Sequence, residues 1–213
     1  TRRPRTLALG LRSPLFRMQM RLDLVSDGAS AKQSKYIGEL ESDTFELQEL
    51  VDELLDYAKM ERAEVQLKRT KIKANEFFRS IIEKVQHESL SNIAFNTDLA
   101  DDTVMSADQA LLNRCASNLI RNAERYGKDE VVISLTATSN GITFSVEDNG
   151  AGMYEVEWPK VFEPFYRINQ DNVTSGYGLG LAICQEIVLL HDGEIDVGRS
   201  HLGGAIFTVS ILS

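Results

Sequence analysis

Histidine, cysteine and basic charge are all scarce in this sequence. Among 213 residues there are three histidines and two cysteines, and 32 acidic side chains outnumber 23 basic ones, giving a net charge of −9. A nucleic-acid-binding protein needs a basic surface, so this balance predicts no nucleic-acid partner. The dispersed His and Cys residues form no zinc-type cluster. Cys115 and Cys184 each lie in an apolar helical pattern, which indicates buried free thiols in a reducing cytosol.

Long apolar runs are also missing. No stretch of 18 or more apolar residues occurs, so we expect no membrane-spanning helix within this sequence, and no secretory leader is recognisable. The basic start "TRRPR" is open to two interpretations, an ordinary solvated terminus or an edge next to a membrane anchor.

Residues 1–64 are predicted to form an antiparallel helical hairpin. Apolar residues recur at steps of three and four from Leu7 to Val25, "SDGAS" (26–30) supplies turn residues, and a second arm runs from about Gln33 to Ala63. The second arm has a heptad-like seam made of Leu40, Thr44, Leu47, Val51, Leu54 and Ala58. Two arms alone cannot bury both apolar faces, so we expect a homodimer with a four-helix bundle. The alternative is a hairpin packed on its own second domain.

Residues 65–213 alternate between helical and strand patterns. Helices are predicted at 74–87, from the N-cap Asp108 to Arg125, and at 179–191. Strands are predicted at 92–99, 130–138, 141–148, 194–200 and 204–212, the second and third as a β-hairpin. The expected fold class is therefore α+β: the helical hairpin, followed by an α/β sandwich with helices on one face of a mixed sheet.

Two short stretches of this second part carry candidate ligand groups. Asn118 and Asn122 are one helical turn apart and share a face, and an amide oxygen suits a Mg²⁺ ion already held by phosphates. In "VEDNGAGM" (146–153), Asp148 ends a strand, where it can accept a hydrogen bond from an exocyclic amine. Gly150 and Gly152 let the backbone approach a flat base closely. Each stretch alone is better explained by a solvated helix face, for the asparagines, or by a plain turn, for Asp148 and its glycines.

Two further stretches complete the series. In "TSGYGLGLAI" (174–183) three glycines precede a helix, where free N–H groups can bind an anion. The loop lacks the preceding strand and downstream acid of the dinucleotide fingerprint. "VFEPFYR" (161–167) carries Phe162 and Phe165, which are typical of a core plug.

The order of these stretches resembles that of one family. Asn-x-x-x-Asn, Asp-x-Gly-x-Gly, Phe-x-x-Phe, Gly-x-Gly-x-Gly and "GGAIF" (203–207), behind a helical hairpin, resemble the N, G1, F, G2 and G3 boxes of bacterial two-component sensor histidine kinases. The resemblance covers essentially the whole chain. It implies a dimerisation and phosphotransfer hairpin (1–64) and a catalytic ATP-binding domain (65–213).

The resemblance also implies ligand roles. Asn122 would ligate Mg²⁺, Asn118 and Arg125 would lie at the phosphates, Tyr126 beside the nucleotide, and Asp148 at the adenine amino group. Residues 168–177 would form a mobile lid over ATP. The full set of implied nucleotide-binding residues is Asn118, Asn122, Arg125, Tyr126, Asp148, Gly150, Gly152, Phe162, Gly176, Tyr177, Gly178, Leu179 and Gly180.

Related ATPases of the gyrase, mismatch-repair and heat-shock chaperone type carry a water-activating glutamate four residues before the magnesium asparagine. Here that position is Asn118, and an amide takes no proton at neutral pH. We therefore expect ATP binding with little hydrolysis, as suits a phosphoryl donor.

The phosphoacceptor position departs from the family. "LGLRSPL" (9–15) aligns with His-Glu-Leu-Arg-Thr-Pro-Leu, so Leu9 replaces the histidine, Gly10 the acidic neighbour and Ser13 a threonine implicated in phosphatase activity. Leucine has no nucleophilic atom, so this chain is not expected to autophosphorylate. The three histidines, His87, His191 and His201, are expected to have structural or surface roles.

Two explanations stay open. Leu9 is either a substitution in an otherwise competent kinase, favoured by the intact nucleotide boxes, or part of a pseudokinase, favoured by the loss of the acidic neighbour at Gly10. The pseudokinase would be an ATP-binding scaffold or a response-regulator phosphatase using Ser13. The resemblance implies a response-regulator receiver domain as partner, docked near Pro14 to Leu22. It places the chain in the cytoplasmic portion of a bacterial inner-membrane protein.

Overall fold

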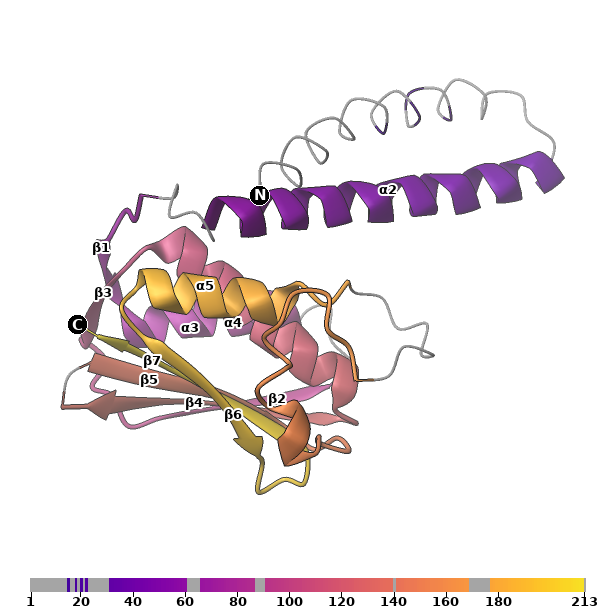
Figure 1. Cartoon of the computed structure of the whole chain (residues 1–213). Helices are drawn as coiled ribbons and strands as arrows, with labels where there is room; N and C mark the ends of the chain where they lie inside the picture. Colours follow the sequence, from indigo (N-terminus) through magenta and orange to yellow (C-terminus); the bar gives the residue numbers. More distant parts are fainter. Residues whose placement is uncertain are drawn as a thin grey trace. The chain divides into compact units, whose positions relative to one another are not determined.

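The computed structural model describes Leu15, Met18, Met20, Leu22 and residues 31–60, 66–86, 91–139, 141–168 and 177–212. The chain separates into two compact units, Thr1–Arg62 and Ala63–Ser213. Figure 1 shows a long helix in the first unit and a layered α/β arrangement in the second. Along the described part of the chain, no helix combines the length and the apolar character needed to cross a membrane.

The described part of the first unit is dominated by helix α2 (Ala31–Met60). Val51 and Leu55 are buried on this helix and form a small apolar cluster with Leu15 of the first arm, against which Leu54 packs. The predicted seam is only partly buried, because Leu40 and Leu47 are 51% and 48% exposed. Sequence periodicity missed Leu55, which is 2% exposed. The single chain therefore leaves one apolar edge of α2 open to solvent.

The second unit is built on a five-stranded sheet in the order β2-β4-β5-β7-β6. Its strands are β2 (Asn92–Thr97), β4 (Glu130–Thr138), β5 (Gly141–Asp148), β6 (Glu194–Arg199) and β7 (Ala205–Leu212). β2 is parallel to β4, and every other neighbouring pair is antiparallel, so the sheet is mixed. The predicted strands and fold class are confirmed.

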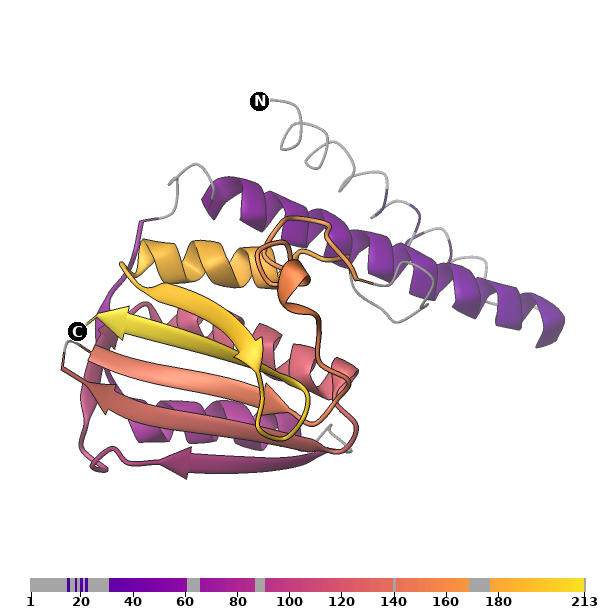
Figure 2. The same ribbon diagram turned by 60° about the horizontal axis from the view of Figure 1, so that its bottom comes forward.

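Three helices, α3 (Ala74–Gln86), α4 (Gln109–Tyr126) and α5 (Gly180–Leu190), cover one face of this sheet (Figures 1 and 2). Alternation along the strands explains the one-sided core. Ile133 and Leu135 of β4 are fully buried, whereas Ser134 between them is only partly buried. The Phe78 ring of α3 lies 4.9 Å from the Phe144 ring of β5, which ties a helix to the middle of the sheet.

A second, two-stranded sheet was not predicted. β1 (Thr70–Lys73) pairs antiparallel with β3 (Val104–Ala107), with Ile72 opposite Met105. Each strand has only four residues, too few to display an alternating pattern. Their pairing joins segments more than 30 residues apart, which local sequence patterns do not reveal.

Asp108 connects three segments at the start of α4. As predicted it is the N-cap, with Oδ1 accepting hydrogen bonds from the N–H groups of Ala110 and Leu111 at 3.1 and 3.2 Å. Its other oxygen accepts from the Lys68 N–H at 2.9 Å, and its own N–H donates to Nε2 of His191 at 2.9 Å. His191 is fully buried beyond α5, so its predicted structural role is confirmed.

Candidate functional site

The two asparagines predicted to face a ligand lie in the second half of α4. Both are half-buried, while Leu119, Ile120 and Ala123 of the same helix are buried in the core. The Asn118 side-chain amide donates to the Gly180 carbonyl at 3.4 Å. A Cβ at Gly180 would lie 3.9 Å from the Asn118 amide. The Asn118 side chain is therefore in direct contact with Gly180, the residue that begins α5.

Asp148 lies at the end of β5, beside the last turn of α4. It is 3% exposed, and its Oδ1 accepts a hydrogen bond from the Gly150 N–H at 2.8 Å. A Cβ at Gly127, directly after α4, would lie 3.2 Å from the Asp148 Cβ. Burial raises the pKa of the Asp148 carboxyl above its ordinary value, although N–H groups of Gly150 and Ala205 counteract this by stabilising the charged form.

Glycines make the close approaches around Asp148 possible. A Cβ at Gly150 would lie 2.0 Å from the Tyr126 carbonyl oxygen, and a Cβ at Gly204 would lie 2.0 Å from Asp148 Oδ1. Real Cβ contacts are never so short, so no other residue fits at either position without a backbone shift. Gly152 has a φ of +68°, a conformation that L side chains rarely adopt. Three motifs far apart in sequence thus surround one carboxylate.

The segment before the predicted lid differs from the expectation. Phe162 packs edge-on against Phe207 of β7, with the ring centroids 6.4 Å apart, as a core plug should. Phe165 was also interpreted as a core residue, but this is wrong: it is 55% exposed and has a φ of +66°. The Phe165 N–H donates to the Gly178 carbonyl at 2.9 Å, so the local backbone is held by a bond across the base of the lid.

A cluster of side chains also stabilises the segment that precedes the predicted lid. The Tyr166 hydroxyl donates to the carboxylate of Glu157, the last residue of the short 3₁₀ helix η1 (Glu155–Glu157). The Lys160 ammonium lies 3.7 Å from the Glu157 carboxylate and 6.0 Å from the Tyr166 ring centre. Of the predicted lid, only Ile168 and Tyr177 belong to the described residues.

Some of the remaining predicted site residues belong to the described part of the chain, and others do not. Arg125 and Tyr126 are exposed at the end of α4, and the side chain of Leu179 is fully buried, so only its backbone is available to a ligand. Gly178 has a φ of +72°. Leu9, Gly10, Ser13 and Gly176 lie outside the described residues, as does His87, for which a structural or surface role is expected.

Sequence reasoning assigned no role to Asn149, although it stabilises the loop behind Asp148. Its Oδ1 accepts hydrogen bonds from the N–H groups of Lys128, Asp129 and Glu130 at 3.0 to 3.3 Å. The signal was the turn-forming Asp-Asn-Gly triplet itself, because asparagine side chains often replace backbone acceptors in turns. Asn149 therefore fixes the loop that leads from α4 into β4.

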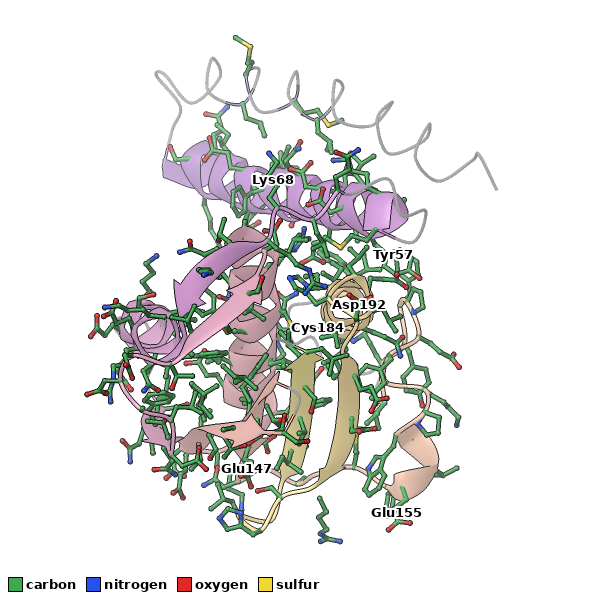
Figure 3. All side chains as sticks on the ribbon, turned by 90° about the vertical axis from the view of Figure 1, so that its left-hand side faces the viewer. Tyr57, Lys68, Glu147, Glu155, Cys184 and Asp192 are labelled. Carbon is green, nitrogen blue, oxygen red and sulfur yellow. The ribbon has the colours of Figure 1, made fainter. Side chains whose placement is uncertain are left out.

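The two predicted core thiols are both free and fully buried, as expected. The thiol of Cys184, which is labelled in Figure 3, lies on α5 and donates to the Cys115 carbonyl of α4 at 3.5 Å. A hydrogen bond with Cys184 and burial raise the pKa of the Cys115 thiol well above its ordinary value. The raised pKa favours the neutral Cys115 thiol, and the two buried side chains pack the interface between α4 and α5.

A metal ion would need help from a bound ligand at this site. Within the described ranges there is no group of three or more His, Cys, Asp or Glu side chains that could hold a metal. The half-buried Asn122 offers one neutral oxygen. That donor fits Mg²⁺, which typically takes one or two protein oxygens and completes its shell with phosphates and water.

Comparison with known proteins agrees with this arrangement. Residues 107–213 match the family described as histidine kinase-, DNA gyrase B- and HSP90-like ATPase. The chain is 34% identical to the sensor protein RstB of Escherichia coli K12 over 206 residues, covering 96% of this chain and 47% of RstB. It is 27% identical to the sensor histidine kinase CpxA of the same strain, covering 91% of this chain and 43% of CpxA.

A solved structure extends the match to both units. Full-length ShkA in complex with AMPPNP superposes with a TM-score of 0.83 at 26% identity, covering 98% of this chain and 45% of ShkA. The chain thus spans about half the length of the curated relatives it matches. It belongs to the family of histidine kinase-, DNA gyrase B- and HSP90-like ATPases and is homologous to the sensor histidine kinases.

Proposed function

We propose that this chain is the core of a two-component sensor histidine kinase, with residues 65–213 binding ATP·Mg²⁺ and residues 1–64 forming the dimerisation and phosphotransfer hairpin. In the parent reaction a histidine nitrogen at position 9 attacks the γ-phosphorus of ATP. The bond to the β,γ-bridging oxygen breaks, ADP leaves, and the phosphoryl group later passes to an aspartate of a response regulator.

One observation carries the nucleotide-binding part of the proposal. The buried carboxylate of Asp148 is surrounded by the loop glycines Gly150 and Gly204 and by the last turn of α4. On the same helix, Asn118 contacts the first residue of α5. A carboxylate acceptor, close backbone and a helix N-terminus are the groups that an adenine amine and a polyphosphate require.

Each residue then has a definite task. Asp148 accepts the hydrogen bond from the adenine amino group, and the N–H groups at the start of α5 face the phosphates together with Arg125. The Asn122 oxygen would hold Mg²⁺, which supplies positive charge to the phosphate oxygens. Phosphoryl transfer needs mainly positioning and charge neutralisation, so no further protein nucleophile is required.

The residue at position 118 determines whether bound ATP is hydrolysed. Its amide is neutral and already donates to the Gly180 carbonyl, so it does not take a proton from water. We therefore expect the pocket to hold ATP with little hydrolysis. This separates the proposal from the chaperone-type ATPases of the same family.

No described histidine substitutes for the missing acceptor. The ring of His191 is fully buried, its Nδ1 lies 2.7 Å from the Ile187 carbonyl, and its Nε2 accepts from Asp108. His201 is exposed in the turn before β7, where its Nδ1 lies 2.8 Å from Glu147 Oε2. Loss of the nucleophile at Leu9 therefore removes autophosphorylation while leaving the nucleotide site intact.

The open edge of α2 supports a homodimer. Leu40 and Leu47 are exposed in the single chain and lie seven residues apart, the repeat of a helical bundle. Burying them against a second copy completes a four-helix bundle. By analogy with the family, a receiver domain would dock near Pro14 to Leu22, and charge reversal at Arg17 and Arg21 should weaken it. The complete protein would be a bacterial inner-membrane sensor with this portion in the cytoplasm.

A second function, favoured by the paired losses at Leu9 and Gly10, is an ATP-binding pseudokinase that sequesters or dephosphorylates the regulator. Ser13 would then position the attacking water. Dephosphorylation of a phosphorylated receiver domain that disappears with Ser13→Ala would favour this function over the kinase.

ATP binding is tested by calorimetric titration of ATP with Mg²⁺ into this chain. We expect Asp148→Ala to weaken binding strongly, because the base loses its acceptor. Asp196→Ala is the matched control, since it removes an exposed carboxylate from β6. Equal affinities for the wild type and the Asp148 variant would contradict the proposed pocket.

A further inference from the structure

Glu147 is a buried carboxylate that the proposed mechanism does not use. It is 6% exposed at the end of β5, next to Asp148 (Figure 3). Neighbouring residues of a strand point to opposite faces, so Glu147 and Asp148 project from the two sides of the sheet. A charge this well buried needs partners.

Its partners all come from the turn between β6 and β7. The Ser200 hydroxyl donates to Glu147 Oε2 at 2.9 Å, and His201 Nδ1 lies 2.8 Å from the same oxygen. Ser200 is 5% exposed, whereas the His201 side chain is 73% exposed. The Ser200 hydroxyl is therefore the protected contact, and His201 is a peripheral one.

Ser200 also makes hydrogen bonds to other residues of the same turn. Its hydroxyl accepts from the Leu202 N–H at 3.0 Å, its own N–H donates to the Gly204 carbonyl at 3.0 Å, and its carbonyl accepts from the Gly203 N–H at 3.1 Å. The position of Gly204 is consequently tied to that of Ser200.

The far end of this turn lies directly on Asp148. The Gly204 Cα is so close that a Cβ would lie 2.0 Å from Asp148 Oδ1 and 2.4 Å from the Asp148 carbonyl oxygen. The Ala205 N–H also favours the charged form of the Asp148 carboxylate and so lowers its pKa. Two adjacent carboxylates of β5 thus hold the same turn, Glu147 at its beginning and Asp148 at its end.

We propose that Glu147 and Ser200 are positioning residues for base recognition: they fix the β6–β7 turn against Asp148 and so hold its carboxylate in the orientation that selects a purine with an amino group at C6 over one with a carbonyl there. The inference rests on the proposed ATP site. When the Ser200 hydroxyl is removed, Glu147 loses its protected donor, the turn loosens, and Asp148 is no longer held between Gly204 and Gly150. Its preference for an amine over a carbonyl should then fall.

The test compares affinities for ATP and ITP, whose base carries a carbonyl in place of the adenine amine. We expect the wild type to prefer ATP, and Ser200→Ala to reduce that preference about tenfold, the loss typical of a misplaced charge-assisted hydrogen bond. ITP affinity should stay within about twofold, because the phosphate contacts are untouched. Ser200→Thr keeps the hydroxyl and should retain the wild-type preference.

Ser210→Ala is the matched control. It removes a serine hydroxyl bond of similar length, 2.8 Å between Ser210 of β7 and Thr143 of β5, away from the β6–β7 turn. We expect this variant to keep the ATP preference of the wild type. A loss of preference equal to that of Ser200→Ala would show a general effect of sheet stability and would overturn the inference.

A separate variant guards against misfolding. Glu147→Gln retains an oxygen acceptor for Ser200 without the charge, and we expect an intermediate ATP preference in a folded protein. If the Ser200 and Glu147 variants change the affinities for ATP and ITP equally, or change neither, the positioning role is overturned. The proposed ATP site would still stand in that case. If the wild type binds ATP and ITP equally, base reading by Asp148 itself is wrong, and the inference falls with it.

Discussion

Gly204→Ala is the substitution whose effect can be worked out most directly from the structure. The new Cβ would lie 2.0 Å from Asp148 Oδ1, 2.4 Å from the Asp148 carbonyl oxygen and 2.6 Å from the Gly150 nitrogen. Two of these three atoms belong to the backbone, so a side-chain rotation alone does not relieve the overlap. Either the β6–β7 turn or the end of β5 must move.

The cost has two parts. Overpacking of this kind costs about 1–3 kcal/mol of folding free energy, and we expect the upper end because backbone atoms are involved. Displacing Asp148 also removes a charge-assisted hydrogen bond to the base, worth about 1.5–3 kcal/mol, which corresponds to roughly 10- to 100-fold weaker ATP binding. Denaturant unfolding measures the first effect and calorimetric titration with ATP the second.

Gly198→Ala in β6 is the matched control. Its Cβ would meet only the Ile206 side chain, at 3.4 Å, which is ordinary contact. We expect near-wild-type ATP affinity for this variant. A folded Gly204→Ala protein that binds ATP as tightly as the wild type would refute the proposed arrangement around Asp148.

Three further predictions concern Asp108, the protonation of Asp148 and the open edge of α2. Burial alone would raise the pKa of Asp108, but N–H donors of Lys68, Leu111 and Ala110 and the neighbouring His191 hold it below its ordinary value. Asp108→Asn should therefore lower the free energy of unfolding by the full amount at neutral pH, and this loss should shrink below about pH 4, near the pKa of an unfolded aspartate. Urea unfolding at several pH values measures the loss, and a loss that does not depend on pH would contradict this prediction. The raised pKa of Asp148 predicts that ATP preference over ITP falls on acidification before an ordinary aspartate would protonate, and Asp148→Asn should abolish that pH dependence in binding assays. Replacing Leu40 and Leu47 together by Asp should convert a dimer to a monomer in sedimentation experiments, with Lys35→Asp as an exposed control; an unchanged mass would exclude this edge as the interface.

The sequence was most informative where local patterns decide the structure. Helix α4 was predicted from its N-cap and apolar periodicity, and the β4–β5 hairpin from strand alternation around a short turn. Both lie where expected, because the signal and the structure are formed by the same few residues. The order of the glycine and asparagine motifs in the sequence was likewise enough to indicate the family.

Prediction failed where distant segments meet or where a local rule is overridden. The β1–β3 pair and the contact between Glu147 and Ser200 join residues 30 or more positions apart, and neither strand pattern nor turn chemistry reveals them. Phe165 was expected in the core because aromatic residues usually are. Instead its backbone takes a φ of +66° and its N–H is bound to the Gly178 carbonyl, which leaves the ring exposed.

The most direct test of the whole account is acid-labile phosphate incorporation from γ-labelled ATP, measured on this chain, on Leu9→His and on Leu9→Gln. The glutamine variant is polar but has no nucleophilic nitrogen, so it controls for the change in polarity. The account predicts labelling of the Leu9→His chain alone, and loss of that label when Asn122→Ala is added. Absence of label in every variant, with ATP still bound, would contradict the kinase function and favour the scaffold or phosphatase.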